Sequence, residues 1–194
     1  MIVLLVIDMQ IGLFGPDTPR HDADAIVERI NAVGRAVRQA GGLVTFIQHD
    51  GPQGDVLEPG SDGWRILPSL ERQDVDLVVR KRACDAFYET KLSEILHQHK
   101  ARRLIITGCA TDFCVDTTVR AAASRDYEIA VVADGHTTAD RPHMDAATII
   151  QHHNWVWKNL IHPRTQIKVL PATIIISQIE SDAAEADRNR QSSA

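Results

Sequence analysis

Three side chains that could act together in one reaction each follow an apolar run of the sequence. They are Asp8, Lys81 and Cys114. A cysteine thiolate is a nucleophile, a nearby cation or helix N-terminus lowers the pKa of a thiol, and an acid can take and return its proton. If the three runs are strands of one sheet, these groups meet at one edge and form a candidate nucleophilic site.

Cys114 lies at the start of a predicted helix. The apolar run at residues 104–106 stops at a small-residue turn, Thr111 or Asp112 can serve as N-cap, and the apolar spacing predicts a helix over about 112–124. A thiol in the first turn is close to the positive end of the helix dipole and to unpaired N–H groups, which favour the thiolate and can hold an oxyanion. We therefore expect a thiol pKa below that of free cysteine. The alternative is that Cys114 packs as a small buried hydrophobe.

Asp8 and Lys81 each have a simpler interpretation as well. Asp8 ends the run at residues 2–7, where an acid stands over the ligand crevice of a parallel sheet, but a strand-end aspartate can equally cap the following turn. Lys81 is the middle of three cations after the run at residues 75–79, a pattern that is usually a solvated surface. Because side chains alternate along a strand, the middle cation differs in face from its neighbours and can point into the crevice.

Strands and helices alternate along the chain. This order predicts a doubly wound, mainly parallel sheet with helices on both faces. A long loop rich in glycine and proline follows the second strand, and a short helical piece is expected to begin at Trp64. The six expected strands are 2–7, 43–48, 75–79, 104–106, 127–133 and 167–170, and the main helices are about 22–40, 90–99, 112–124, 142–160 and a last one from Pro171.

Length and composition narrow the class of protein. The 194 residues fit one domain over 1–180 with a polar tail over 181–194 that is expected to fray. The formal net charge of −5 disfavours nucleic acid and anionic membrane as partners and favours a small molecule. No apolar run is long enough to cross a bilayer, and the opening residues lack the features of a signal peptide, so we expect a cytoplasmic protein.

The cysteines and glycines exclude several kinds of site. Cys84, Cys109 and Cys114 cannot pair completely and have no paired-ligand spacing for zinc, which suits free thiols in a reducing compartment. Neither dinucleotide nor P-loop fingerprint occurs. We expect no metal and no cofactor. The polar patch His152-His153-Asn154 is interpreted as capping or a subunit contact rather than as metal ligands.

Four segments together resemble the isochorismatase-like cysteine hydrolases, a superfamily that includes nicotinamidases and N-carbamoylsarcosine amidohydrolase. The resemblance extends over most of the chain to about Leu160, and the third and fourth segments are the specific ones. The segments are LLVIDMQ at 4–10, PGSDGW at 59–64, VVRKRACDAFYET at 78–90 and TGCATDFCVDTTVRAA at 107–122.

The resemblance implies a three-layer α/β/α fold and a catalytic triad that falls on Asp8, Lys81 and Cys114. It also implies a non-proline cis peptide between Cys109 and Ala110, and an oxyanion hole formed by the N–H groups of Ala110 and Cys114. Oligomers are usual in this superfamily, so a homo-oligomer is expected. Nicotinamidases carry an Asp-x-His metal motif, which this chain lacks after His49-Asp50.

A metal-independent amidohydrolase acting on a small carboxamide is the leading interpretation of the sequence. Vinyl-ether hydrolysis of the isochorismatase type, and a non-catalytic binding or scaffold protein of the same fold, remain alternatives. The role of Cys84, where the superfamily more often has serine or glycine, stays open. The residues expected to contact substrate are Gln10, Phe14, Trp64, Phe87, Cys109 and His136.

Overall fold

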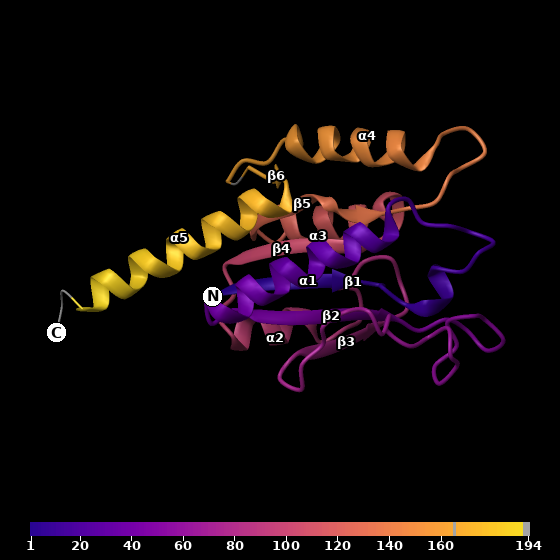
Figure 1. Cartoon of the computed structure of the whole chain (residues 1–194), viewed down its shortest axis with the longest axis horizontal. Helices are drawn as coiled ribbons and strands as arrows, with labels where there is room; N and C mark the ends of the chain where they lie inside the picture. Colours follow the sequence, from indigo (N-terminus) through magenta and orange to yellow (C-terminus); the bar gives the residue numbers. More distant parts are fainter. Residues whose placement is uncertain (165, 192–194) are drawn as a thin grey trace.

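A six-stranded parallel sheet forms the middle layer of the protein (Figure 1). The computed structural model describes residues 1–164 and 166–191. The strand order is β3-β2-β1-β4-β5-β6, with every neighbouring pair parallel, which confirms the predicted doubly wound α/β fold. The strands are β1 (Ile2–Ile7), β2 (Leu43–His49), β3 (Leu77–Lys81), β4 (Arg103–Cys109), β5 (Glu128–Thr137) and β6 (Lys168–Leu170).

Helices cover both faces of the sheet and complete the three layers. The helices α1 (Ala23–Gln39) and α5 (Ala172–Gln191) pack side by side on one face. The other face is covered by α2 (Leu92–Gln98), α3 (Asp116–Ala123) and α4 (Ala146–Lys158). Two short helical turns lie at the ends of strands: η1 (Ile11–Leu13) after β1 and a π-helical turn, η2 (Thr111–Val115), after β4.

The central strand β1 shows why the sequence builds three layers. Its side chains alternate between two separate cores, with Val3, Leu5 and Ile7 in one and Leu4 and Val6 in the other. All five are at most 1% exposed. A strand that is apolar on both faces must be covered on both faces, as parallel sheets are. The continuous apolar run at the start of the chain therefore fixes the place of β1 in the middle of the sheet.

The carboxyl ends of β1, β3 and β4 place the candidate chemistry at one edge. Gly108 lies beside Ile7 where β4 pairs with β1, and its φ of +121° is one that glycine adopts without strain. A Cβ at Gly108 would collide with the backbone carbonyl oxygen of Ile7. Only glycine fits there, and the close approach brings the end of β4 against the end of β1.

The bounds of several elements differ from the prediction, and β5 and α4 are two examples. The strand β5 was expected to end at Ala133, but its pairing resumes with His136 opposite Gly108 after an irregularity in the register. The helix α4 was expected from about Pro142, but it begins at Ala146 because Asp145 accepts from the N–H of Thr148 and caps it.

The regions around Trp64 and beyond residue 180 also differ from expectation. Trp64 lies in a turn rather than a helix, where its indole N–H donates to Asp50 at 2.9 Å and fixes the loop. The residues expected to fray continue α5 as far as Gln191, since the helix contains neither glycine nor proline. The remainder of the expected tail, 192–194, lies outside the described residues.

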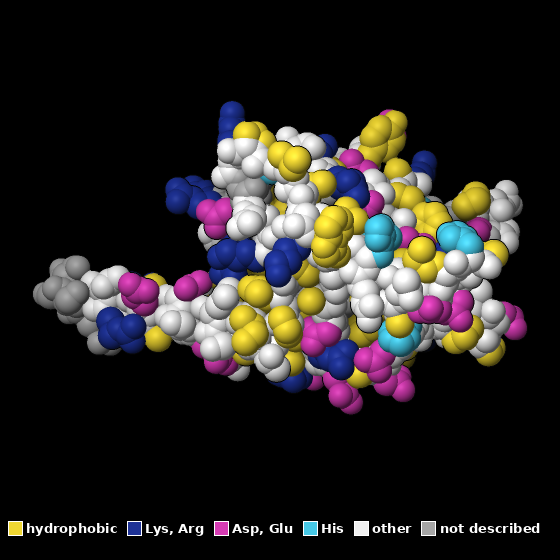
Figure 2. Space-filling model, turned by 90° about the horizontal axis from the view of Figure 1, so that it is seen from above, with side chains coloured by type: hydrophobic (Ala, Val, Ile, Leu, Met, Phe, Trp, Pro, Cys, Tyr) yellow, Lys and Arg dark blue, Asp and Glu magenta, His cyan; other side chains and the backbone are white. Residues whose placement is uncertain are grey.

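The end of α5 stands clear of the body of the protein. Ile175 and Ile179 are buried against α1 and the sheet, whereas the side chains that follow are mostly exposed. Both acidic and basic side chains lie along this projecting part (Figure 2). Across residues 1–164 and 166–191, no helix combines the length and the apolar character needed to span a bilayer.

Candidate active site

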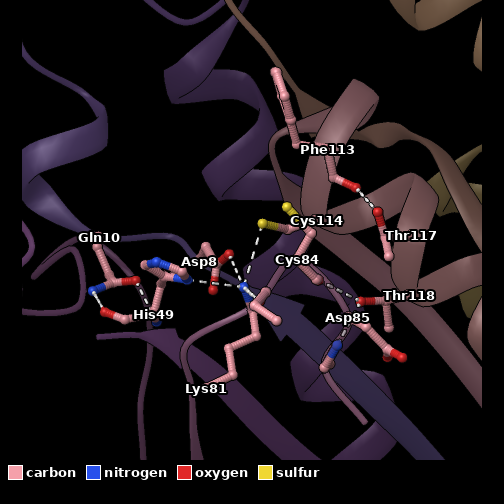
Figure 3. A network of polar contacts seen from close by, with 12 residues as sticks. Asp8, Gln10, His49, Lys81, Cys84, Asp85, Phe113, Cys114, Thr117 and Thr118 are labelled. Atoms are coloured by element: carbon pink, nitrogen blue, oxygen red, sulfur yellow. Dashed lines mark hydrogen bonds and ion pairs between the residues drawn. The ribbon is translucent and has the colours of Figure 1, made fainter. Parts of the chain in front are cut away.

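Lys81 is the centre of a buried polar cluster at the carboxyl edge of the sheet (Figure 3). Its Nζ lies 2.7 Å from Oδ2 of Asp8 and 3.3 Å from Sγ of Cys114. The ammonium also donates to the carbonyl oxygen of Ala83 at 2.9 Å. The side chains of Lys81 and Asp8 are 0% and 2% exposed. The structure thus brings the acid, the cation and the thiol together in one site.

The strands β1 and β3 position Asp8 and Lys81 in the site. Asp8 follows β1 in the left-handed region at φ +46°, which aspartate tolerates better than most residues, and its N–H donates to Ile47 at 2.9 Å. Lys81 ends β3 and is buried, whereas Arg80 and Arg82 on either side are exposed. The alternation along β3 therefore selects the middle cation for the site, as predicted.

The nucleophile candidate lies in the π-helical turn η2 rather than in the first turn of an α-helix. The N–H groups of Phe113 and Val115 both donate to the carbonyl oxygen of Ala110, at 3.0 and 3.1 Å. The wider turn ends at Val115, and α3 continues from Asp116. Single π-helical turns are frequent at functional sites. The peptide bond between Cys109 and Ala110, directly before this turn, is cis.

The pKa of the Cys114 thiol is shifted in the direction opposite to the one expected from the sequence. Burial, followed by the Asp8 carboxylate, raises the pKa of Cys114, and this outweighs the lowering by Lys81. The predicted low pKa is therefore wrong for the free protein, because a buried thiolate beside a carboxylate is disfavoured. For Lys81, burial opposes the charge, but Asp8 and Cys114 raise its pKa, so the ammonium is retained.

Asp8 has a free oxygen that can take a proton. Burial raises the pKa of Asp8 above the ordinary value of 3.8, although Lys81 partly offsets the effect. While Oδ2 pairs with Lys81, Oδ1 is buried and has no hydrogen-bond partner among the described residues. Asp8 and Cys114 are close enough for each to shift the pKa of the other. The arrangement suits proton transfer from the thiol to this carboxylate as the sulfur attacks.

A cavity of about 320 Å³ opens over the cluster. This volume is at the lower end of the range for small-molecule sites. Both Cys109 and Ala110 line it together with the thiol, and so does Cys84, the residue whose role the sequence left open. The lining residues are Asp8, Leu13, Arg20, His49, Leu57, Cys84, Cys109, Ala110, Phe113, Cys114 and Arg141.

Five of the six side chains expected to contact substrate do not line this cavity. Gln10 is fully buried, and its amide is occupied by the backbone of His49 and Trp64. Trp64 lines a different hollow and stacks against Arg80 at 5.2 Å. Of the six, only Cys109 lies in the cavity wall.

The other three pack within the cores or against them. Phe14 packs against the core under α1, and Phe87 is 5% exposed in the opposite core. His136 is fully buried in β5, where Nδ1 lies 2.9 Å from Oγ1 of Thr111 and Nε2 lies 3.0 Å from Oδ1 of Asn154. Burial lowers the pKa of His136 to about 4, so its ring is neutral at pH 7. These contacts give His136 a structural role next to the η2 turn.

His49 is a member of the cluster that the sequence interpretation missed. Its Nδ1 lies 3.3 Å from Nζ of Lys81. Burial and the charge of Lys81 lower the pKa of His49, so the ring is neutral and Nδ1 can accept from the ammonium. The signal was present, because His49 ends β2 at the same edge at which Asp8 and Lys81 were found.

A second ion pair holds the η2 turn. Asp112 accepts two hydrogen bonds from Arg141, at 2.8 and 3.0 Å, and one from the hydroxyl of Thr138 at 2.6 Å. The guanidinium of Arg141 also lies over the ring of Phe113, 5.0 Å from its centroid. Asp112 and Phe113 directly precede the thiol residue. Arg141 is therefore placed to fix the turn that carries it.

Residues capable of holding a metal do not gather in the described part of the chain. No group of three or more histidine, cysteine or acidic side chains with suitable placement occurs there. In the patch at 152–154, His153 contacts the carbonyl oxygen of Ile149 at 2.9 Å, and Asn154 bridges His136 and Ala133. Of the two tryptophans near this patch in α4, Trp157 is fully buried, whereas Trp155 is 66% exposed.

The proteins that this chain resembles in sequence include two hydrolases. Streptothricin hydrolase of Streptomyces noursei is 32% identical over 139 residues, which cover 72% of this chain and 55% of that protein. Ureidoacrylate amidohydrolase RutB of Methylorubrum extorquens is 29% identical over 177 residues, covering 72% of this chain and 71% of RutB. The chain spans about half the length of the streptothricin hydrolases that it matches.

Solved structures share the same fold. The crystal structure of an isochorismatase family protein superposes with a TM-score of 0.81 at 32% identity, over 87% of this chain and 97% of that chain. A cysteine hydrolase of Pseudomonas syringae gives a TM-score of 0.84 at 21% identity, over 93% and 92%, a likeness of fold alone. A family model for the isochorismatase domain matches residues 3–155. The chain therefore belongs to the isochorismatase family of hydrolases.

Proposed function

We propose that this protein is a cysteine hydrolase that cleaves an amide-type C–N bond of a small molecule through a thioester on Cys114. One observation carries the proposal: Nζ of Lys81 lies within 3.3 Å of both the Asp8 carboxylate and the Cys114 sulfur, and these two partners both line the cavity. Nucleophile, proton acceptor and orienting cation are the components of nucleophilic catalysis. The similarity to RutB, an amidohydrolase, supports the same class of bond.

The first half-reaction forms the thioester. Sγ of Cys114 attacks the carbonyl carbon while its proton passes to Oδ1 of Asp8, the oxygen left free by the ion pair. The negative charge that develops on the carbonyl oxygen is held by the N–H groups of Ala110 and Cys114. Asp8 then returns the proton to the nitrogen, the C–N bond breaks, and ammonia or an amine leaves.

The second half-reaction restores the thiol. Water attacks the thioester carbon while Asp8 takes one of its protons, and the tetrahedral intermediate collapses with cleavage of the C–S bond. The proton held by Asp8 passes to the leaving sulfur. Throughout, Lys81 stays protonated and keeps the carboxylate and the sulfur oriented, consistent with its raised pKa.

Release of ammonia from a panel of small carboxamides and ureas, measured on Cys114→Ala and Asp8→Asn, tests the proposal. We expect each variant to lose turnover by at least about a thousandfold, the scale seen when a member of a catalytic triad is removed. Ser124→Ala, at the far end of α3, is the control and is expected to keep full activity. Circular dichroism establishes that the variants are folded. Undiminished turnover in Cys114→Ala would overturn the thioester mechanism.

Vinyl-ether hydrolysis is the second candidate, and the raised pKa of Asp8 favours it. Such a reaction needs a proton donor, and a buried carboxyl with an elevated pKa is a better donor at neutral pH than an ordinary aspartate. In that case turnover of an enol-ether substrate would survive Cys114→Ala and be lost in Asp8→Asn. The same pair of variants thus separates the two reactions.

A further inference from the structure

We propose that Arg20 is the receptor for an anionic group of the substrate, so that the protein acts on small amides that carry a carboxylate. Arg20 lines the cavity over the thiol together with Cys109 and Arg141. A guanidinium has several N–H donors in a planar fork that matches a carboxylate. The inference rests on the proposed function and names its class of substrate.

The position of Arg20 is fixed from two sides. Its Nε donates to the carbonyl oxygen of Leu13 at 2.6 Å, which leaves the other donors of the fork available. The next residue, His21, is tied to the end of β5: its N–H donates to Thr138 at 3.0 Å, and its carbonyl oxygen accepts from Thr137 at 2.7 Å. A cation held in this way binds an anion without first losing much side-chain freedom.

Arg20 is the cation of the cavity whose charge is not balanced. Lys81 is paired with Asp8 and Arg141 with Asp112, whereas Arg20 forms no ion pair with any acid in the described part of the chain. The other charged or titratable groups of the cavity wall do not change this balance. His49 is neutral, and burial raises the pKa of the Cys109 thiol to about 12, an effect that the nearby Arg20 opposes.

Acidic side chains on the outer side of Arg20 are not its partners either. Asp17 and Asp140 line a neighbouring hollow with Arg20, but neither forms an ion pair with it. Asp140 instead accepts from the N–H of Ala146 at 2.8 Å. The guanidinium is half-buried, and a partly desolvated cation that is not paired with an acid gains most from an anionic ligand.

The apolar side chains and the volume of the cavity limit the part of the substrate that joins its anionic group to the scissile bond. Leu13, Leu57 and Phe113 contribute apolar side chains to the cavity. A volume of about 320 Å³ fits a short ligand. The geometry therefore favours a short aliphatic or unsaturated acid with a terminal carboxamide or ureido group, its carboxylate on Arg20 and its carbonyl carbon at Cys114. RutB, a relative that is a ureidoacrylate amidohydrolase, agrees with this class.

The test compares acids with their neutral isosteres. Malonamate, succinamate and glutaramate are each assayed beside the corresponding diamide, in which a carboxamide replaces the carboxylate, with wild type, Arg20→Gln and Arg20→Lys. Arg82→Gln is the matched control, because it removes a positive charge from the same edge of the sheet but lies outside this cavity. Unfolding curves show that the loop anchored at Leu13 stays folded.

We expect wild type to prefer at least one acid over its diamide by about tenfold or more. Arg20→Gln is expected to lower kcat/KM for that acid by about ten- to a hundredfold, the size of a lost charge-assisted hydrogen bond, and to change the diamide less than about twofold. Arg20→Lys keeps part of the preference, and Arg82→Gln keeps all of it. Equal losses on acid and diamide, or no preference in wild type, would overturn the inference and leave the proposed function standing.

A binding measurement tests the anion site separately from the reaction. If no amide is turned over, the proposed function fails, and calorimetric titration of succinamate into the Cys114→Ala protein decides the role of Arg20. Binding that is lost when Arg20→Gln is added upholds the anion site without the reaction. Binding that is absent, or that is unchanged by Arg20→Gln, overturns the anion site as well.

Discussion

The ammonium of Lys81 lies 2.7 Å from the carboxylate of Asp8 at a place from which water is almost excluded. The pair is not isolated, since the ammonium also contacts Cys114, Ala83 and the neutral ring of His49. A buried ion pair of this kind contributes little net stability, but breaking it exposes one charge to an apolar interior. A role in a reaction therefore explains this ion pair better than a role in stabilising the fold.

Removing one member of this pair has a measurable cost. Lys81→Met is expected to lower the free energy of unfolding by about 3–5 kcal/mol, because the Asp8 carboxylate is left buried without its cation. Asp8→Asn combined with Lys81→Met should recover a large part of that loss. Urea denaturation measures both. Arg35→Met, which breaks an exposed ion pair with Glu71, is the control and should cost less than about 1 kcal/mol. A Lys81→Met cost as small as the control would contradict the account.

The pH dependence of Cys114 alkylation tests its environment. Because burial and Asp8 raise the pKa of this thiol, the rate of iodoacetamide labelling is expected to rise with pH through a midpoint above the ordinary value of about 8.5. Asp8→Asn removes the adjacent negative charge and should lower that midpoint, whereas Lys81→Met should raise it. Peptide mass spectrometry follows the label. A wild-type midpoint below about 8.5 would restore the expectation from the sequence.

The ion pair between Asp112 and Arg141 makes a separate prediction about the η2 turn. Partial burial opposes ionisation of Asp112, but hydrogen bonds from Arg141 and Thr138 outweigh it and lower its pKa. Asp112→Asn is expected to reduce kcat more than it changes KM, and to lower stability at pH 7 by about 1–3 kcal/mol. Because the pKa of Asp112 is lower in the folded than in the unfolded protein, its ionised carboxylate stabilises the fold above the unfolded-state pKa of about 3.9. This stabilisation is lost as the pH falls through the folded-state pKa.

Stability curves at several pH values check the linkage. Wild type and Asp112→Asn should differ at pH 7 and converge as the pH falls below about 4. Asp62→Asn, on an exposed pair with Arg65, should show little difference at either pH. A constant gap between wild type and Asp112→Asn at all pH values would show that the lost charge is not the cause.

His136 predicts acid sensitivity of the fold. Its pKa is lowered from 6.5 to about 4 by burial, so the unfolded chain binds a proton in this range that the folded protein does not. The neutral His136 contributes fully to the free energy of unfolding above about pH 6.5. This contribution, about 3 kcal/mol in all, is lost as the pH falls toward 4. The wild-type slope should flatten in His136→Gln and persist in His97→Gln, an exposed control. An unchanged slope in His136→Gln would assign the acid sensitivity to other groups.

The sequence was sufficient to predict the sheet and the three groups at its edge, because strand periodicity determines both. Val3, Leu5 and Ile7 alternate with Leu4 and Val6, and the same alternation separates Lys81 from its exposed neighbours. A residue at the carboxyl end of a parallel strand must lie at the ligand edge. His49 obeys the same rule and could have been found by applying it to β2.

Residues placed by loops and by polar contacts could not be predicted in this way. Arg20 reaches the cavity because its own loop is closed by a contact with Leu13 and because His21 is tied to the distant end of β5. Gln10 has the residue type of a substrate contact, but its amide is occupied by the backbone. The pKa of Cys114 depends on burial and on its distance from Asp8, and a helix dipole argued from the sequence includes neither.

The mass of the peptide that contains Cys114, recorded during turnover, tests whether a thioester forms. Wild-type protein is mixed with an amide from which it releases ammonia, quenched in acid within the first turnovers, and digested for mass spectrometry. We expect an acyl adduct on Cys114, equal in mass to the substrate less ammonia, that hydroxylamine removes and that is absent in Cys114→Ala. Steady ammonia release with no adduct, and with full activity in Cys114→Ala, would contradict the thioester mechanism.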